Sequence, residues 1–322
     1  MSHEALASEL GTNIGPLRAS PAPARVATCA AYARIRKMAD GAIGPTNTTP
    51  TTFVDAPNGV KYAYRRFGAE TETPLLLLPR FRGDMDTWDP GLLDTLAAER
   101  PVVLFDNRGV SSTSGRTPST IAEMARDVIA FCEAVGLSAV DLLGFSLGGF
   151  VAQETALIRP HLIRRLILAA TSPQGAPDLH GWRKDIADAV RRDEPGGAEL
   201  LYTFFKPTET SQAAGREYLG RFLARTFDRD VSSTLQTRDA HYDAVCDWGI
   251  PDHGKLQRLS GIVQPTFVCN GDADAMIPPR FTHLMGGLIP DAIVKIYPDA
   301  GHGFLFQHHA EFAEDVNRFL DA

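Results

Sequence analysis

Short apolar runs recur along the chain after residue 70. They span residues 74–79, 101–105, 139–145, 162–170, 265–269 and 292–297. Each run has the length of a β-strand, and several are apolar at every position, as is typical of strands buried on both faces of a parallel sheet. Helical patterns fill the intervals. The alternation therefore predicts an α/β fold built on a doubly wound, mostly parallel sheet.

The clearest helical pattern covers residues 120–135. Thr120 and Glu123 have the spacing of a capping box, which marks the start of a helix. Apolar residues then recur every three or four positions, and Cys132 is one of them. We therefore predict an amphipathic helix with Cys132 buried on its inner face as a small apolar residue.

Residues 53–67 have a different pattern. Two strand-like runs flank Asn58-Gly59, a dipeptide that favours a two-residue type I′ hairpin turn. The sequence therefore predicts that the sheet begins with an antiparallel hairpin.

The alternation stops between residues 176 and 261. This stretch predicts helices near 181–192, 196–205, 210–227 and 232–247, and no strand. A helical insertion in an α/β sheet lies beyond the carboxyl ends of the strands, where ligands bind. We therefore expect residues 176–261 to form a helical cap, or lid. Its many aromatic side chains are expected to pack against a core made of residues 51–175 and 262–322.

The first 50 residues differ from the rest in charge. They hold five basic and three acidic residues, a charge of +2, and the whole chain carries −7, so residues 51–322 carry −9. They lack the apolar segment of a secretory signal. We interpret residues 1–50 as an N-terminal arm with a helix near 24–39. The arm is either loosely attached or packed on a partner subunit in a homodimer, and a transit peptide is a third interpretation.

The overall composition excludes several classes of protein. Hydrophobic residues make up 44% of the chain and charged residues 22%, which is typical of a globular protein and not of a disordered one. No run reaches the roughly 18 apolar residues that a bilayer span needs, so we expect no membrane association. Lys and Arg (32) are fewer than Asp and Glu (39) and form no long run, which argues against nucleic-acid binding.

The four cysteines form no recognisable motif. Cys29, Cys132, Cys246 and Cys269 are far apart, with no CxxC pair and no Cys/His cluster. This spacing argues against a zinc site and a disulfide framework, so we expect no metal and no cofactor. Few, scattered cysteines are typical of a reducing compartment, and we expect the protein to be cytoplasmic.

A serine lies between an apolar strand and a helical pattern, in Gly144-Phe145-Ser146-Leu147-Gly148. In this context G-x-S-x-G is the signature of a nucleophile elbow, a tight turn that presents a serine hydroxyl at the carboxyl end of a strand. The glycines are needed because side chains beside so tight a turn would collide. The start of the next helix supplies free N–H groups and positive dipole. Ser146 is therefore the candidate nucleophile.

A serine hydroxyl needs a base, and the base needs an acid to orient it. Of nine histidines, His302 is the candidate base because it lies between two glycines just beyond the last strand-like run. Asp272 and Asp274 follow the preceding run, so the chain order is Ser…Asp…His. From the residues alone either aspartate can be the acid, and Asp272 can instead turn the loop through its side chain.

From about residue 52 onward, the chain resembles the α/β-hydrolase-fold serine hydrolases. The motifs that carry the resemblance are the serine turn, Gly301-His302-Gly303, Asp106-Asn107-Arg108-Gly109, and Gly271-Asp272-Ala273-Asp274 followed by Pro278. The resemblance implies an eight-stranded sheet. It also implies that Asp274, three residues after the glycine, is the acid, and that the Asp-x-Arg-Gly loop is structural.

The resemblance also implies an oxyanion hole, made by the backbone N–H groups of Phe81 and Leu147. The family usually has His-Gly before the first of these donors, where this chain has Pro79-Arg80.

Two arginines lie beside this departure from the family pattern. We expect Arg80 and Arg82 to pair with nearby acids such as Asp84 and Asp86. The alternative is that they bind a substrate carboxylate.

These features predict a cofactor-free serine hydrolase that acts on a carboxylic ester or lactone through an acyl-enzyme. The aromatic cap favours a small to medium apolar substrate. Three alternatives fit the same residues: a cofactor-free perhydrolase or haloperoxidase, a hydrolase of carbon–carbon bonds in diketones, and a non-catalytic ligand receptor. Because the turn holds serine, chemistry with an aspartate nucleophile, as in epoxide hydrolases and dehalogenases, is disfavoured.

Overall fold

The computed structural model describes residues 44–194 and 196–322 of the chain. Residues 1–43 of the N-terminal arm, including the helix expected near 24–39, lie outside the described residues. The described part begins with a short helix, α2 (Pro45–Thr48), that precedes the first strand.

Eight strands form one sheet in the order β1-β2-β4-β3-β5-β6-β7-β8. They are β1 (Thr52–Asp55), β2 (Lys61–Gly68), β3 (Leu75–Leu78), β4 (Pro101–Phe105), β5 (Val140–Phe145), β6 (Ile163–Ala169), β7 (Thr266–Gly271) and β8 (Ile293–Tyr297). The β1–β2 and β2–β4 pairs are antiparallel, and the remaining pairs are parallel. The predicted eight-stranded, mostly parallel α/β sheet is therefore confirmed.

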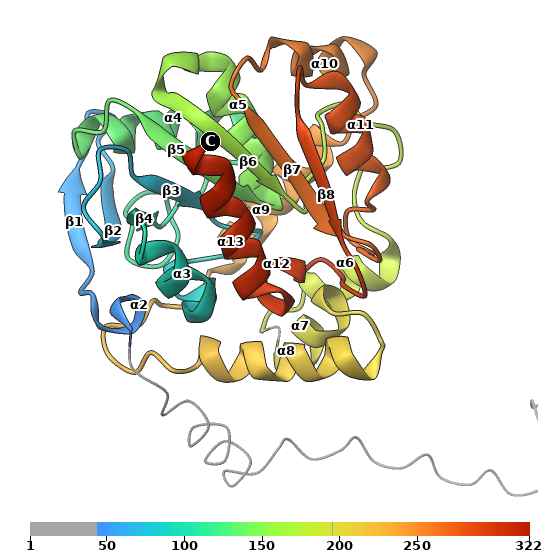
Figure 1. Cartoon of the computed structure of the whole chain (residues 1–322), viewed down its shortest axis with the longest axis horizontal. Coiled ribbons are helices and arrows are strands. Elements are labelled where there is room, and N and C mark those ends of the chain that lie inside the picture. The colour runs from blue at the N-terminus through green and yellow to red at the C-terminus, as the bar shows by residue number, and fades with distance from the viewer. Residues whose placement is uncertain (1–43, 195) are drawn as a thin grey trace, which may run out of the picture.

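Helices cover both faces of this sheet (Figure 1). Besides α2, the described helices outside the β6–β7 connection are α3 (Pro90–Ala97), α4 (Ile121–Ala134), α5 (Leu147–Ile158), α11 (Arg280–Leu288), α12 (Phe304–Gln307) and α13 (His309–Asp321), with 3-10 turns at Met85–Thr87 and Pro160–Leu162. α3 and α13 pack together on one face, and α4 and α5 pack together on the other. Among the described residues, no helix is both long and apolar enough to cross a membrane.

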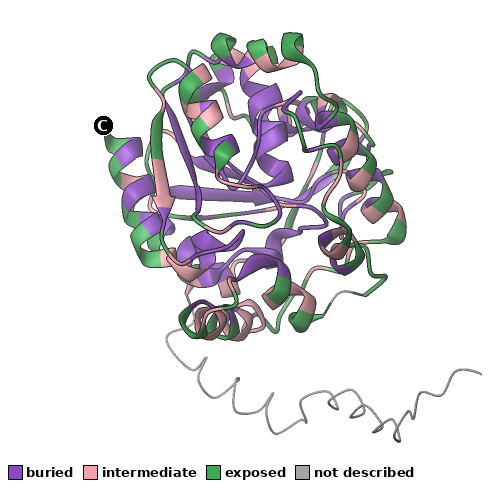
Figure 2. Cartoon of the chain, turned by 90° about the vertical axis from the view of Figure 1, so that its right-hand side faces the viewer, coloured by how far each residue is buried: buried purple, intermediate pink, exposed green. Residues whose placement is uncertain are grey.

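The central strands are apolar because both of their faces are covered. β3 and β4 are buried at every position, and Figure 2 shows the middle of the sheet buried while the outer helices keep an exposed side. α4 follows its sequence pattern. The Thr120 side chain accepts a hydrogen bond from the Glu123 N–H at the start of the helix, and Cys132 is fully buried on its inner face.

The first hairpin is present, but its turn differs from the prediction. The Ala56 N–H donates to the Val60 carbonyl at 2.9 Å, and the Gly59 N–H donates to the Ala56 carbonyl at 3.0 Å. The loop therefore has three residues, 57–59, of which only Gly59, at φ +79°, has a positive φ. The type I′ prediction is wrong because that turn also needs a positive φ at Asn58. Pro57, whose ring fixes φ near −65°, starts the turn one residue earlier.

Between β6 and β7 the chain forms the helical insertion, by which we mean residues 176–261. Its helices are α6 (Lys184–Val190), α7 (Gly197–Phe204), α8 (Glu209–Phe222), α9 (Leu235–Trp248) and α10 (His253–Gln257), followed by a 3-10 turn at Arg258–Gly261. In Figure 1, α7 and α8 lie below α3 and α12, beyond the ends toward which β7 and β8 point. The described part of the insertion contains no strand, in agreement with the pattern.

Helix α8 ends earlier than the 210–227 pattern predicts. After Phe222 the chain turns back toward the N-terminal strands. Arg225 donates to the carbonyl groups of Thr46 and Thr49 at 3.0 and 2.9 Å, and the Asp228 carboxylate accepts the Thr51 N–H at 2.6 Å. These contacts with residues distant in sequence outweigh the local helical pattern.

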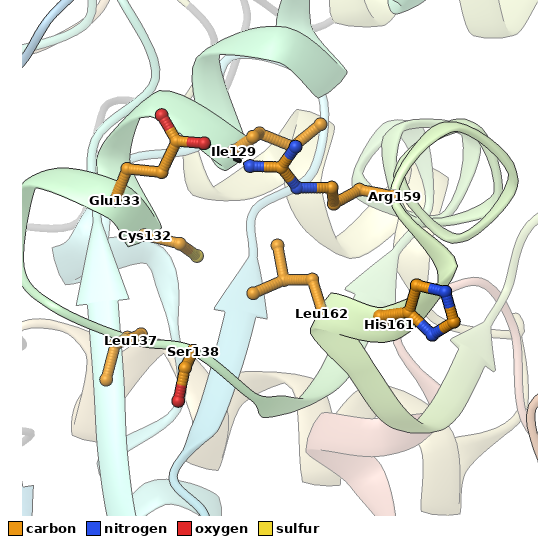
Figure 3. Close-up of a pocket in the computed structure, with 8 residues that line it drawn as sticks. All are labelled: Ile129, Cys132, Glu133, Leu137, Ser138, Arg159, His161 and Leu162. Atoms are coloured by element: carbon orange, nitrogen blue, oxygen red, sulfur yellow. Dashed lines mark hydrogen bonds and ion pairs between the residues drawn. The ribbon is translucent and has the colours of Figure 1, made fainter.

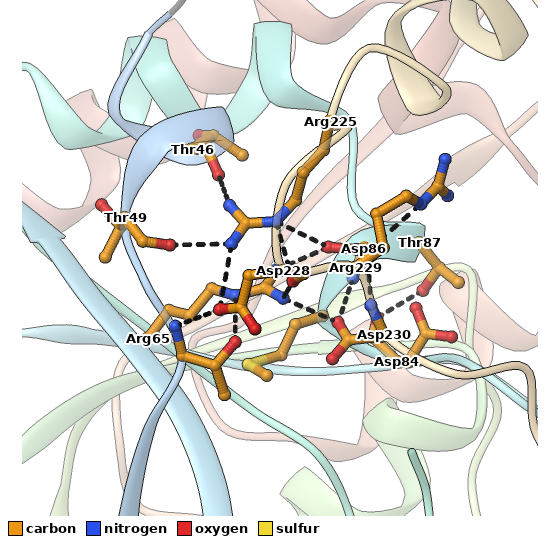
Figure 4. A network of polar contacts seen from close by, with 12 residues as sticks. Thr46, Thr49, Arg65, Asp84, Asp86, Thr87, Arg225, Asp228, Arg229 and Asp230 are labelled. Carbon is orange, nitrogen blue, oxygen red and sulfur yellow. Dashed lines mark hydrogen bonds and ion pairs between the residues drawn. The ribbon is translucent and has the colours of Figure 1, made fainter. Parts of the chain in front are cut away.

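Buried charges join the insertion to the sheet (Figure 4). We call Arg65, Asp86, Arg225 and Asp230 the Arg65 cluster. Arg65 on β2 donates to Asp86 at 2.5 Å and to Asp230 at 3.2 Å, and Arg225 lies 3.5 Å from Asp86. All four side chains are at most 4% exposed. Such burial is tolerated because each charge has an opposite partner.

Asp84 lies beside the Arg65 cluster, but its Oδ1 is buried without a hydrogen-bond partner in the described residues. Burial, together with the Asp230 and Asp86 carboxylates and against the attraction of Arg80, raises the pKa of Asp84 to about 7. The folded chain therefore binds this proton more tightly than the unfolded chain, in which an aspartate has a pKa near 3.9. The stability that Asp84 contributes is complete below about pH 4 and is lost as the pH rises through about 7.

We expect Asp84→Asn to remove this pH dependence. The free energy of unfolding of the variant, relative to the wild type, should rise by about 2–3 kcal/mol between about pH 5 and pH 8, because one pKa unit corresponds to about 1.4 kcal/mol. Urea unfolding of both proteins at the two pH values measures the difference. A difference that is the same at both pH values would show that Asp84 is ionised throughout.

Candidate active site

Ser146 lies at the turn between β5 and α5. Its backbone, at φ +57° and ψ −119°, is in a region that residues other than glycine rarely adopt, and the residue is only 1% exposed. A Cβ on Gly144 would lie 2.4 Å from the Gly148 carbonyl oxygen, and a Cβ on Gly148 would lie 2.1 Å from that of Leu78. The two glycines of the motif are therefore required by the closeness of the backbone on both sides of the serine.

Hydrogen bonds fix the Ser146 backbone to the neighbouring strand. The Ser146 N–H donates to the carbonyl of Ala169, the last residue of β6, at 2.9 Å. The Thr171 hydroxyl donates to the Ser146 carbonyl at 2.9 Å. Hydrogen bonds to both the N–H and the carbonyl of Ser146 therefore hold the strained turn in place.

His302 and Asp274 are in direct contact. His302 Nδ1 lies 2.7 Å from Asp274 Oδ2, and both side chains are at most 1% exposed. Asp274 Oδ1 accepts the backbone N–H groups of Met276 and Ile277 at 2.8 and 2.9 Å. With Nδ1–H donating to the carboxylate, the lone pair lies on Nε2. Within the described residues, Nε2 is buried and has no hydrogen-bond partner.

Asp272, the other candidate acid, has different contacts. Its carboxylate accepts the N–H groups of Asp299 and Ala300 at 3.0 and 3.1 Å. It therefore ties the loop after β7 to the loop that carries His302. Of the two aspartates that the residues alone leave open, the structure brings Asp274 to the histidine.

Aromatic rings surround His302. The rings of Phe145, on β5, and Phe204, on α7, each lie 5.1 Å from the imidazole. Phe306 on α12 packs against both of these phenylalanines. The side chain from α7 places the helical insertion in direct contact with the candidate base, and the surroundings of the base are apolar.

The two N–H groups expected to form the oxyanion hole have no partner in the described part of the chain. Within the described residues, neither Phe81 N–H nor Leu147 N–H donates a hydrogen bond. Gly148, at the start of α5, lies against the carbonyl groups of Leu78 and Pro79. This approach brings the loop after β3 next to Gly148, the residue that follows Leu147.

The two arginines of this loop do not pair with the expected acids. The Arg80 Nη1 donates to the Phe81 carbonyl at 3.0 Å, and its guanidinium lies 5.1 Å from the centre of the Phe204 ring. Arg82 donates instead to groups of the helical insertion. The expected partner Asp86 is occupied by the Arg65 cluster, which explains why the local pairing does not form.

The loop that contains Asp106 and Arg108 contacts the protein itself. Asp106 Oδ1 accepts the Met85 N–H at 2.9 Å, and Arg108 forms an ion pair of 2.9 Å with Asp127 on α4. These contacts agree with the structural role that was expected for this loop.

Sequence reasoning missed His241. This residue of α9 is fully buried, and its Nδ1 accepts the N–H of Arg82 at 3.1 Å. Its ring lies 6.0 Å from that of Phe81. No local motif marks the residue, and the pattern assigns it only to the cap.

Two other observations bear on the chemistry. Across the described residues, no group of three or more His, Cys, Asp or Glu side chains is arranged to hold a metal ion. A pocket of about 200 Å³ is lined by Ile129, Cys132, Glu133, Leu137, Ser138, Arg159, His161 and Leu162 (Figure 3). It lies where β5 and β6 begin, whereas Ser146 follows the other end of β5, so this pocket is separate from the serine.

Comparisons with known proteins agree with the fold. A family model described as "alpha/beta hydrolase fold" matches residues 73–309. The chain is 26% identical over 246 residues to a putative non-heme bromoperoxidase BpoC of Mycobacterium tuberculosis, covering 74% of this chain and 89% of that protein. It is 27% identical over 236 residues to a pimeloyl-acyl-carrier-protein methyl ester esterase of Aliivibrio salmonicida, covering 72% of this chain and 86% of that protein.

A solved structure is also similar. An alpha/beta hydrolase fold protein from Chitinophaga pinensis superposes with a TM-score of 0.81 at 36% sequence identity. The match covers 86% of this chain and 99% of that one.

Proposed function

Because the chain belongs to the α/β-hydrolase fold family, we propose that it is a serine hydrolase that cleaves a carboxylic ester or lactone of a small to medium apolar substrate. Ser146, His302 and Asp274 act as its catalytic triad. The observation that carries the proposal is the buried 2.7 Å contact between His302 Nδ1 and Asp274, in a chain whose Ser146 occupies the strained turn typical of a nucleophile.

The first half of the reaction forms an acyl-enzyme. The Ser146 hydroxyl attacks the acyl carbon while His302 takes its proton on Nε2. The hydrogen bond from Nδ1 to Asp274 supports this role because it leaves the lone pair on Nε2 and stabilises the imidazolium that forms. The bond to the alcohol then breaks, and His302 gives the proton to the leaving oxygen.

The second half releases the acid. His302 takes a proton from water, the resulting hydroxide attacks the acyl carbon, and the Ser146 oxygen leaves with the proton that His302 returns. In both halves the oxyanion accepts hydrogen bonds from the N–H groups of Phe81 and Leu147. Their lack of other partners supports this assignment. Each such donor typically contributes about 3–4 kcal/mol to transition-state stabilisation.

The surroundings of the triad favour an apolar substrate. Phe145 and Phe204 pack on His302, and such walls bind alkyl or aryl groups better than charged ones. Ser146 and His302 are 1% and 0% exposed, so substrate binding requires a displacement of the residues that cover them. We assign this movement to the helical insertion, residues 176–261, acting as a cap.

A perhydrolase is the second candidate function, favoured by the similarity to the relative named a putative non-heme bromoperoxidase. In that reaction hydrogen peroxide replaces water in the second half, and the acyl group leaves as a peracid. The peracid then oxidises bromide to hypobromite and returns to the carboxylic acid.

A fluorophosphonate probe tests the nucleophile. We expect the Ser146 oxygen of the wild type to attack the phosphorus and expel fluoride, leaving a covalent label that mass spectrometry locates on Ser146. Ser146→Ala should abolish labelling. Ser172→Ala, which removes another buried serine hydroxyl without a partner in the described residues, is the matched control and should label normally. Folded wild-type protein that does not label would contradict the proposal and favour a ligand receptor.

A substrate panel then separates the candidate reactions. We expect turnover of p-nitrophenyl esters of short to medium acyl chains or of lactones. Turnover only of diketones would favour carbon–carbon hydrolysis. Bromination of a dye in the presence of acetate, hydrogen peroxide and bromide, lost in Ser146→Ala, would favour the perhydrolase.

A further inference from the structure

Arg82 has a backbone conformation that needs support. Its φ of +56° is in the left-handed region, although the residue is neither glycine nor asparagine. Such a conformation is strained, and it persists only where the surrounding structure holds it. Arg82 directly follows Phe81, whose N–H is the first oxyanion donor of the proposed mechanism. The contacts that fix the backbone of Arg82 therefore also fix the position of the Phe81 N–H.

The groups that hold Arg82 all belong to the helical insertion. The Arg82 N–H donates to His241 Nδ1 at 3.1 Å. Its guanidinium donates to the carbonyl groups of Arg192 and Asp193 at 2.7 and 3.0 Å and to the Ser233 hydroxyl at 3.0 Å. Its side chain thus reaches two separate segments of the insertion, at residues 192–193 and at Ser233, and its backbone N–H reaches a third, helix α9.

His241 is suited to be a permanent acceptor for this loop. The ring is fully buried, and burial together with the positive charge of Arg82 lowers the pKa of His241 to about 3. The imidazole is therefore neutral under ordinary conditions, and the hydrogen bond from Arg82 assigns the lone pair to Nδ1 and the proton to Nε2. The ring also lies 6.0 Å from Phe81, so it contacts the loop through both backbone and side chain.

We propose that Arg82 and His241 are positioning residues: hydrogen bonds from the helical insertion hold the Phe81–Arg82 peptide in the conformation in which the Phe81 N–H donates to the oxyanion. The proposal rests on the serine hydrolase function proposed above. It means that the insertion does more than cover the substrate, because the oxyanion hole is complete only while the insertion is in place. Closure of the insertion then both excludes water and completes the catalytic site.

Two substitutions at position 241 separate the acceptor from the bulk of the ring. In His241→Asn, the amide oxygen can occupy the place of Nδ1 and accept the Arg82 N–H, whereas His241→Leu fills the space without an acceptor. We expect His241→Leu to lower kcat for a p-nitrophenyl ester about 10- to 100-fold with KM within about threefold, because an oxyanion donor acts in the transition state. His241→Asn should restore most of kcat.

A matched control comes from the same helix. Val245, one turn further along α9 and 1% exposed, makes no hydrogen bond to the loop, so Val245→Ala should destabilise the insertion while keeping kcat within about threefold of the wild type. Arg82→Met removes the guanidinium donors but keeps the strained backbone, and it should lower kcat as His241→Leu does. It provides the same test if His241→Leu does not fold.

The affinity of a trifluoromethyl ketone, which forms an oxyanion on the enzyme, should fall in parallel with kcat in His241→Leu and Arg82→Met. The proposal is overturned if folded His241→Leu keeps the wild-type kcat, or if His241→Asn is as slow as His241→Leu. Fluorophosphonate labelling of the wild type tests the serine hydrolase function independently of the variants at positions 82 and 241. An enzyme that labels at Ser146 but is insensitive to position 241 is still a serine hydrolase.

Discussion

Replacing His302 with alanine is expected to lower kcat for ester hydrolysis by about 10⁴- to 10⁶-fold and to leave KM within about threefold. The reason is that Nε2 of His302 is the base for Ser146 in the proposed mechanism, and its other nitrogen is already committed to Asp274. Stopped-flow and steady-state assays with a p-nitrophenyl ester measure the loss in acylation and in turnover. A kcat within tenfold of the wild type would show that His302 is not the base.

The two aspartates of the acid loop provide an internal comparison for this result. Asp274→Asn should lower kcat by about 10⁴-fold, because an amide N–H facing Nδ1 favours the wrong tautomer of His302. Asp272→Asn alters a carboxylate that contacts the N–H groups of Asp299 and Ala300 and, at 3.8 Å, the Lys206 ammonium, but not His302, so its kcat should stay within about tenfold of the wild type. Equal losses in both variants would contradict the assignment of Asp274 as the acid.

Replacing Arg65 with methionine is expected to lower the free energy of unfolding by about 3–5 kcal/mol. The substitution leaves Asp86 and Asp230 buried without the arginine that contacts both of them. It also removes the hydrogen bonds from Arg65 to Thr51 and to the Asp228 carbonyl. Urea or thermal unfolding measures the loss.

The next residue of the same strand is the control. Arg66 has a side chain that is 43% exposed, and its partner, Glu70, is 3.7 Å away and more exposed still. Ion pairs of this kind contribute little, so Arg66→Met should change stability by less than about 0.5 kcal/mol. If Arg65→Met were no more destabilising than Arg66→Met, the Arg65 cluster would contribute nothing that methionine packing does not replace.

The central strands could be predicted from the sequence because burial on both faces leaves an unbroken apolar run. The runs at 74–79 and 101–105 became β3 and β4, each buried at every position. The turn of the first hairpin could not be predicted from Asn58-Gly59 alone, because Pro57 competes for the same turn. Helix α8 was predicted too long because Arg225 and Asp228 bond to residues at the start of the described chain.

The candidate site also has residues that could be predicted from the sequence and residues that could not. Ser146, His302 and the pair Asp272 and Asp274 could be proposed from the sequence because tight turns and short loops leave local signals in glycine and in spacing, and the family resemblance then favoured Asp274. The partners of Arg82 leave no such signal, since they lie 110 to 159 residues away and two of them are backbone carbonyl groups. Arg65 is similar: an arginine beside Arg66 in a strand suggests an exposed position, and only its distant partners account for its burial.

The contacts of Arg82 also limit how this protein can be recombined with its relatives. Arg82 belongs to the core, but the four groups among the described residues that accept its backbone N–H and its guanidinium all lie on the helical insertion. A chimaera that receives a foreign segment in place of residues 176–261 would keep the strained loop and lose every group that supports it. Residues 80–83 and the insertion therefore form one exchangeable unit, although nearly a hundred positions separate them in the chain, and substrate range is best altered by transferring both together.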